Sequence, residues 1–329
     1  MIIFYKSLHN RGVTVVAVSL AIELLIMTGV GFVIKRKNIV QEQFTGQVSA
    51  FIMNACLPCL VFHSMTSIDL SIDILQKCGV VLLLATLVNL ILLGIGQIFY
   101  IAMGKTGSAR LARYSVVILH ATFMGLPVID ALFGVEGNMY YAIFMIPLRL
   151  LYYGFSKIML SPPGTDGGIN TKAIVKAFLT PSIIVMPFAI AFGMLGIHLP
   201  TPVANCVANM AKLCSPLGLI LCGTVIAKYD IKKLFCLRYM RMPMVRNIAM
   251  PALFVLLTRP LYMLGVDEMI IDMIIIYTAF PIASLLPTFI LQYDPDPDVQ
   301  FEAASITIIA TLLSIITIPF WCFIIQTVA

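Results

Sequence analysis

Two long apolar stretches of the chain are each interrupted by a short segment that combines proline with small or polar residues. The first interruption, at 122–127, reads Thr-Phe-Met-Gly-Leu-Pro, and the second, at 281–288, reads Pro-Ile-Ala-Ser-Leu-Leu-Pro-Thr. In a lipid bilayer a helix can unwind only where other protein or a water-filled cavity satisfies the freed backbone groups. Paired interruptions in the two halves of a chain point to a solute site at mid-membrane. We therefore expect the functional site where these two segments meet.

The composition places the whole chain in a membrane. Only 11% of the 329 residues are charged, 60% are hydrophobic, and the mean hydropathy is +1.02. An average soluble protein has roughly a quarter charged residues. The formal charge is +6, but the basic residues lie between apolar runs and form no single patch, so we expect lipid and no nucleic acid as a partner. The fold class predicted is an all-α polytopic membrane protein.

Apolar runs long enough to cross a bilayer predict ten transmembrane helices. Their expected limits are 13–34, 46–66, 74–102, 112–133, 139–160, 176–196, 204–227, 244–264, 269–291 and 302–326. The first run is too long for the core of a signal peptide and ends in the basic cluster 35–37, so we interpret it as a retained membrane helix. The interruptions fall in the fourth and ninth helices.

The basic residues predict the orientation. Most Lys and Arg residues follow the odd-numbered helices, at 35–37, 105–113, 157–176 and 228–246. Positive loops stay in the cytoplasm, so both termini should face outward from the cell membrane. Five helices per half make the second half enter the membrane in the opposite direction. We therefore expect two inverted five-helix repeats, 1–160 and 176–329, joined by a cytoplasmic linker at 161–175.

The interruptions would create a binding site from helix ends. The N-terminal ends of half-helices attract anions, and their carbonyl ends attract cations or protonated groups. Hydroxyl groups, a glycine that permits close approach, and ionisable residues within spans complete the set of candidates. The candidate substrate-binding residues are Asn54, His120, Thr122, Gly125, Pro127, Arg149, Lys212, Ser284, Pro287 and Thr288, and Glu23 is the candidate coupling-ion residue.

Several of these candidates have a structural alternative. Arg149 is the more specific anchor because a guanidinium can bind a carboxylate through two hydrogen bonds. The alternative role for Arg149 and Lys212 is a structural salt bridge, and the alternative role for His120 is a structural hydrogen bond. Asn54 either repairs its helix one turn before a proline or lines the cavity. Glu23 either binds a proton or sodium ion or pairs with a basic residue.

The sequence predicts no catalytic residue, metal site or cofactor. Eight cysteines lie in or near apolar runs without His or carboxylate partners, which is typical of small packing residues. The acidic segment 294–298 (Asp-Pro-Asp-Pro-Asp) lacks the spacing and glycine of a calcium loop, and we interpret it as the entry to the last helix. No nucleophile elbow or zinc-binding helix pattern is present, which disfavours a membrane-embedded enzyme.

Four segments in a fixed order resemble the auxin efflux carrier family, which includes plant auxin exporters and bacterial carriers of malonate-like acids. The segments are Phe51–Pro58, Gly125–Gly134, Ser215–Gly223 and Pro281–Tyr293, followed by Asp296-Pro297 and Thr317-Ile-Pro319. The resemblance is to the malonate-transporter-like bacterial branch. It implies ten helices in inverted repeats, a scaffold domain, and a transport domain that contains the crossed broken helices. It also implies a small organic anion as substrate and an elevator-like motion.

We therefore expect a secondary carrier of a mono- or dicarboxylate, working as a homodimer. The main alternative is a sodium-coupled carrier of the bile-acid-symporter type, which has the same architecture but needs clustered acids and amides near the crossing. Only Glu23 and Asn54 offer such groups. A membrane-embedded enzyme and a channel are disfavoured, the channel because no polar stripe that would line a pore is evident. A proton or a sodium ion is the candidate coupling ion.

Overall fold

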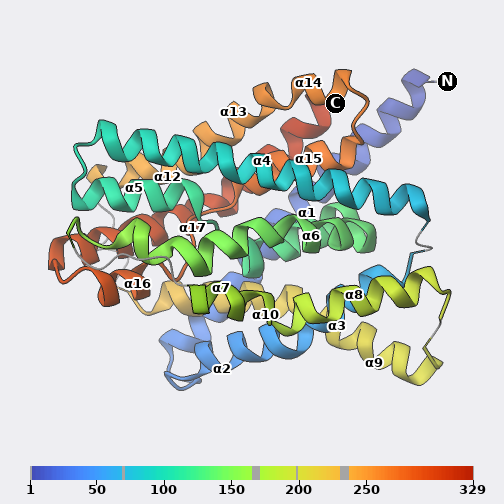
Figure 1. The fold of residues 1–329 in the computed structure, drawn as a ribbon, viewed down its shortest axis with the longest axis horizontal. Coiled ribbons are helices and arrows are strands. Elements are labelled where there is room, and N and C mark those ends of the chain that lie inside the picture. Colours follow the sequence, from blue (N-terminus) through green and yellow to red (C-terminus); the bar gives the residue numbers. More distant parts are fainter. Residues whose placement is uncertain (1, 69–70, 165–170, 198, 230–236, 329) are drawn as a thin grey trace.

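The computed structural model describes residues 2–68, 71–164, 171–197, 199–229 and 237–328. Its helices run side by side along one axis, and the two termini lie toward the same end (Figure 1). In the first half the helices are α1 (Ile2–Arg36), α2 (Phe44–Phe51), η1 (Ile52–Cys56), α3 (Leu57–Thr66), α4 (Ile72–Ala102), α5 (Gly107–Val117), η2 (Ala121–Gly125) and α6 (Leu126–Leu160). The opposite end carries the basic cluster 35–37 and the turn between α4 and α5, and we call it the basic end.

The second half begins with a short helix and contains the second interrupted helix. Its helices are α7 (Thr171–Phe178), α8 (Pro181–Met194), α9 (Thr201–Lys212), α10 (Cys214–Ala227), η3 (Leu237–Met240), α12 (Arg241–Met244), η4 (Val245–Ala249), α13 (Met250–Leu257), α14 (Arg259–Met263), α15 (Glu268–Ala279), α16 (Leu286–Tyr293) and α17 (Pro297–Val328). The turn between α16 and α17 lies at the basic end (Figure 1).

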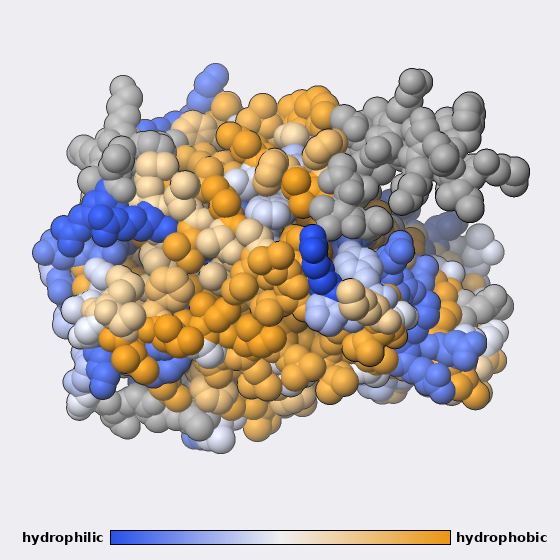
Figure 2. All heavy atoms as spheres, turned by 90° about the horizontal axis from the view of Figure 1, so that it is seen from above, coloured by the Kyte–Doolittle hydropathy of each residue, from blue (hydrophilic) through white to orange (hydrophobic). Residues whose placement is uncertain are grey.

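Seven helical stretches among the described residues are long and apolar enough to cross a membrane. They are Val18–Arg36, Phe44–Thr66, Ile72–Ala102, Ala121–Leu160, Thr201–Ala227, Arg238–Met263 and Pro297–Ile325. Apolar side chains such as Leu83 and Ile98 on α4 are 61% and 66% exposed, and such exposed apolar surface is typical of a helix that faces lipid. Figure 2 shows an apolar band between more hydrophilic ends on one face of the molecule. The prediction of an all-helical, multi-pass membrane protein is confirmed at this level.

Fewer stretches qualify than the ten spans predicted, partly because α6 contains two arms. Gly134 has a φ of +59° and a non-helical conformation within α6. The Tyr141 hydroxyl donates a hydrogen bond of 2.9 Å to the Ala121 carbonyl. In a straight helix residues 20 positions apart are about 30 Å apart, so the chain must reverse at Gly134. The arms 126–133 and 135–160 therefore form a helical hairpin.

The other reason is that α8, α15 and α16 are short. α8 has 14 residues, α15 has 12 and α16 has 8. Each falls below the length that one helix needs to cross the bilayer alone. α15 and α16 together occupy the ninth predicted span, 269–291, and the unwound residues between them divide that span.

Three short π-helical segments interrupt longer helices, and each ends two residues before a proline. η1 precedes Pro58, η2 precedes Pro127 and η4 precedes Pro251. Proline has no N–H group and its ring clashes with the carbonyl four positions earlier. A local π-helical turn accommodates this clash by adding a residue to the turn, and such turns are frequent at functional sites.

Candidate functional site

The two interruptions lie side by side and bind each other through the backbone. α5 ends at Val117 and α15 ends at Ala279, and Leu119 and Ile282 form an antiparallel bridge between the unwound segments. The His120 N–H donates to the Pro281 carbonyl at 2.8 Å, and the Ala283 N–H donates to the Ile118 carbonyl at 3.3 Å. Each broken helix therefore satisfies backbone groups that the other one frees, as a lipid environment requires.

A cavity of about 150 Å³ adjoins this bridge. Residues from α2, η1, both interruptions and the long arm of α6 line it. Its polar lining includes Ser49, His120, Thr122, Arg149 and Ser284, and most other lining residues are apolar or aromatic. The volume exceeds what several water molecules need, so the cavity is large enough to hold a small solute.

Arg149 brings a buried positive charge to the cavity. Its side chain is 8% exposed, and one terminal nitrogen donates to the Ser182 hydroxyl on α8 at 2.7 Å. The ion pairs of the described residues are Lys77–Asp267 and Arg110–Asp294, so none of the described carboxylates pairs with Arg149. Arg149 lies roughly 16 Å along the helix from Leu160 and roughly 22 Å from Gly134, which is mid-depth for this arm.

His120 connects the two interruptions through side chains. Its Nε2 atom and the Ser284 hydroxyl lie 2.8 Å apart, and its buried Nδ1 atom has no hydrogen-bond partner among the described residues. The imidazole is 5% exposed and lies beside the Phe123 ring, with 5.9 Å between the ring centroids. The Nδ1 atom of His120 is therefore an unsatisfied polar group buried next to the cavity.

The predicted site residues divide into two groups. Four of them line the cavity: His120, Thr122, Arg149 and Ser284. The others do not line it: Gly125, Pro127 and Pro287 are buried within the predicted interruptions, whereas Asn54, Lys212, Thr288 and Glu23 are exposed. The Asn54 amide donates to the Ala50 carbonyl of its own helix at 2.8 Å.

Gly125 permits the close packing that holds the α6 hairpin together. A Cβ atom at this position would lie 2.3 Å from the Tyr141 hydroxyl and 2.9 Å from the Phe280 ring. These contacts join the first interruption to the opposite arm of the hairpin and to the end of α15. The glycine therefore acts through packing next to the cavity.

One buried charge at the crossing is not among the predicted site residues. The sequence predicts Arg246 in a cytoplasmic loop, but it is completely buried within η4. Its Nε atom donates to the Phe280 carbonyl at 3.0 Å, and one terminal nitrogen lies 3.4 Å from the Val116 carbonyl. Helical structure begins at 237, before the predicted limit of 244, so Arg246 lies well within the membrane-spanning stretch Arg238–Met263 and not at its edge.

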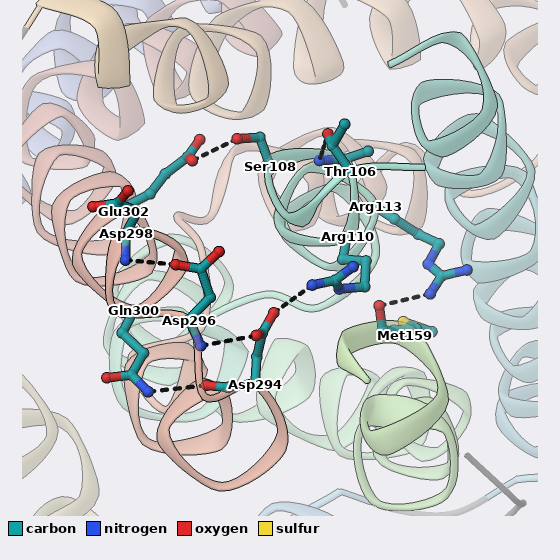
Figure 3. Close-up of polar contacts among 11 residues, drawn as sticks. Thr106, Ser108, Arg110, Arg113, Met159, Asp294, Asp296, Asp298, Gln300 and Glu302 are labelled. Carbon is teal, nitrogen blue, oxygen red and sulfur yellow. Dashed lines mark hydrogen bonds and ion pairs between the residues drawn. The ribbon is translucent and has the colours of Figure 1, made fainter. Parts of the chain in front are cut away.

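The basic end is held together by a network of polar contacts (Figure 3). Arg110 on α5 forms a buried ion pair with Asp294, which follows α16. The Ser108 hydroxyl donates to Glu302 on α17 at 2.6 Å, and Arg113 donates to the Met159 carbonyl at 2.6 Å. These contacts tie both broken helices to α6 and α17.

The acidic segment 294–298 takes part in this network and also leads into α17. The Asp296 N–H donates to Asp294 at 3.1 Å, and the Asp298 N–H donates to Asp296 at 2.9 Å (Figure 3). α17 begins at Pro297, so the interpretation of this segment as the start of the last helix is confirmed.

Apolar helices around a cavity that holds a few polar groups, at the meeting point of two interrupted helices, define a multi-pass membrane protein with the geometry of a transporter. The sequence model of the family described as membrane transport protein matches residues 16–322, and the chain belongs to this family, the auxin efflux carriers. It is also similar to a protein of Methanothermobacter thermautotrophicus named "Uncharacterized transporter". The two are 22% identical over 309 residues, which cover 91% of this chain and 95% of the relative.

Proposed function

We propose that this transporter is a secondary carrier that moves a small organic anion across the cell membrane by alternating access. The observation that carries the proposal is the Arg149 guanidinium, which is buried at mid-depth, lines the cavity, and has no carboxylate partner among the described residues. Burying an unpaired charge costs several kcal/mol, whereas an anionic ligand would supply both the opposite charge and hydrogen-bond acceptors.

The rest of the lining favours a small acid with an apolar part. Leu119, Met145, Leu148 and Tyr153 surround the polar groups of the cavity. One carboxylate would face Arg149, and a second polar group of the ligand would reach His120 or Ser284. A mono- or dicarboxylate of small size meets these requirements, and a highly charged anion such as a polyphosphate does not.

The proposed architecture is ten spans in two inverted five-helix repeats. The reversal at Gly134 supports it because this turn separates the fourth and fifth predicted spans. The paired interruptions support it because they occupy corresponding places in the two halves. The basic end would face the cytoplasm, and both termini would face outward.

The packing of the helices suggests which parts would move. In a first group of helices, α3 packs on α8 and α9, and α1 packs on α10. In a second group, α4, α5 and α6 pack on each other, and α17 packs on both α15 and α16. Ser49 and Met53, from α2 and η1, bring the first group to the cavity, and the interruptions and α6 bring the second. An elevator motion would carry the second group past the first.

A ligand screen tests this proposal directly. Purified protein is heated with malonate as a dicarboxylate, phenylacetate as an aromatic monocarboxylate, and chloride as a reference, at two pH values and with or without sodium. We expect one of the acids to raise the melting temperature in a saturable manner and to enter proteoliposomes that contain the protein. An absence of saturable binding and uptake across a panel of organic acids would contradict the proposal.

A further inference from the structure

The side chain of Arg246 reaches the point where the two broken helices meet. η4 places Arg246 and Asn247 in succession inside the protein, and both are 0% exposed. The Asn247 side-chain amide donates to the Ala310 carbonyl at 2.8 Å. The main-chain carbonyl of Asn247 accepts from the Trp321 indole at 2.8 Å. These bonds to α17 fix the position of η4, and Arg246 extends from η4 toward α5 and α15.

The two acceptors of Arg246 are carbonyls that the interruptions set free. In a continuous helix, the Val116 carbonyl would accept from the His120 N–H, but that N–H donates to the Pro281 carbonyl instead. Phe280 caps the C-terminal end of α15, and its carbonyl has no following helical turn to bind. One guanidinium therefore binds the carbonyl ends of both broken helices.

Arg246 also neutralises the electrostatics of these ends. The C-terminal end of each helix carries a partial negative charge, and two such ends meet here. Arginine remains charged in proteins, and no described carboxylate forms an ion pair with Arg246. Its second terminal nitrogen is buried without a partner among the described residues. The positive charge is therefore balanced by main-chain carbonyls and helix ends.

In carriers with discontinuous helices, unwound carbonyls and the C-terminal ends of half-helices are the groups that coordinate a coupling sodium ion or proton. We propose that Arg246 is a resident cation that occupies these acceptors permanently, so that the carrier needs no sodium or potassium ion to assemble its site. Arg246 is then a positioning residue. The inference rests on the proposed function, since it concerns the coupling of that carrier.

A cation titration tests this without any acid. Wild-type protein is unfolded thermally in sodium, potassium or choline chloride at equal ionic strength. We expect the same melting temperature in all three salts. A saturable rise with sodium or potassium that choline does not reproduce would overturn the proposal. If no organic acid binds in the ligand screen, the proposed function fails, whereas this titration still decides whether the crossing needs a metal cation.

Two variants separate a resident cation from a packing residue. Arg246→Lys keeps a positive charge, and Arg246→Met keeps an apolar side chain of similar length. We expect Arg246→Met to melt lower than the wild type and to recover part of the loss with methylguanidinium or sodium, whereas Arg246→Lys responds to neither cation. If Arg246→Met is as stable as the wild type and insensitive to both cations, Arg246 only packs and the proposal is wrong.

Arg241→Met provides the matched control because Arg241 is exposed at the start of the same helical stretch. It should show neither the loss nor the recovery. If Arg246→Met does not fold, the wild-type titration and Arg246→Lys decide the question. A sodium-dependent melting temperature in either protein would then overturn the proposal, and the same temperature in all three salts would support it.

Discussion

The Nε2 atom of His120 and the hydroxyl of Ser284 lie 2.8 Å apart, although 164 positions separate them in the chain. This bond joins the unwound segments of the two broken helices at the edge of the cavity. The backbone bridge between Leu119 and Ile282 lies beside it. The two helices are therefore joined by both main chain and side chains at the place where each loses its own hydrogen bonds.

Replacing Ser284 by alanine should destabilise this junction. The variant leaves the buried His120 imidazole without either hydrogen-bond partner among the described residues, and an unsatisfied buried polar group costs about 1–3 kcal/mol. We expect a lower melting temperature in detergent. Thr288→Ala, in the exposed part of the same segment, should leave the melting temperature unchanged. Equal effects of the two variants would contradict the role of the bond.

A cysteine pair at positions 119 and 282 should form a disulfide. The hydrogen bonds on either side make Leu119 and Ile282 a non-hydrogen-bonded antiparallel pair, whose Cα atoms are typically about 4.5 Å apart. This separation lies within the range of disulfides. We expect Leu119→Cys with Ile282→Cys, in a background without other cysteines, to crosslink in membranes under mild oxidation. Neither single variant should do so, and a pair that stays reduced would mean the interruptions do not meet.

Arg149→Gln should weaken the binding of an organic acid by about 10- to 100-fold, because hydrogen bonds to charged groups contribute about 1.5–3 kcal/mol. Arg149→Lys should bind more tightly than Arg149→Gln since it keeps the charge but loses the two-pronged geometry. Binding is measured by calorimetry or by thermal shift. Lys212→Gln is the control, because Lys212 is exposed and does not line the cavity. Wild-type affinity in Arg149→Gln would remove Arg149 from the site.

The double variant Pro127→Ala with Pro287→Ala should insert into membranes normally but turn over more slowly. Pro127 and Pro287 lie in the first turns of α6 and α16. Alanine at 127 allows η2 to close into a regular α-helix, and alanine at 287 allows α16 to extend backwards into the unwound segment. Uptake into proteoliposomes measures turnover. Pro319→Ala, inside α17, removes a proline from a continuous helix and should leave turnover unaffected. Unchanged turnover in the double variant would mean that other residues set the interruptions.

The ion pair at the basic end should matter more than the one at the opposite end. Side chains of Arg110 and Asp294 are 8% and 3% exposed, whereas those of Lys77 and Asp267 are 45% and 32% exposed. Removing one partner of a buried pair costs about 3–5 kcal/mol, and an exposed pair contributes about 0–1 kcal/mol. We expect Arg110→Ala to unfold far more easily than Lys77→Ala in denaturant titrations. Similar losses would show that burial does not set the contribution of these pairs.

The sequence predicts the interruptions well because their signals are local. Proline lacks an N–H group, so the prolines and small residues within 122–127 and 281–288 favour a break. The structure unwinds residues 280–285 at the second segment and residues 118–120 just before the first, whose own residues are helical in η2 and α6. The sequence also predicts a break between the spans 112–133 and 139–160, and the chain leaves the helical conformation at Gly134. The paired positions in the two halves predict that the interruptions meet, but the groups that join them depend on packing between residues 164 positions apart, which no local pattern specifies.

Side-chain placement is the part that sequence cannot supply. Asn54, Lys212 and Glu23 were chosen because they are polar within apolar runs, but a helix can turn such a residue outward, and all three are exposed. Their roles stay predictions. Arg246 shows the opposite case. A basic residue at the edge of a predicted span is typical of a loop, whereas the helix begins earlier and the Arg246 side chain is buried.

The three π-helical segments have a consequence for how this chain can vary. Each turn holds one more residue than an α-helical turn, so deleting a single residue there would restore a regular helix and leave the residues after it on the same faces. A deletion in a regular part of a span would instead rotate everything after it by about 100° and exchange its lipid-facing and protein-facing sides. A gap of one residue at η1 or η4 in a related chain therefore signals the loss of the π-helical turn within an unchanged helix orientation.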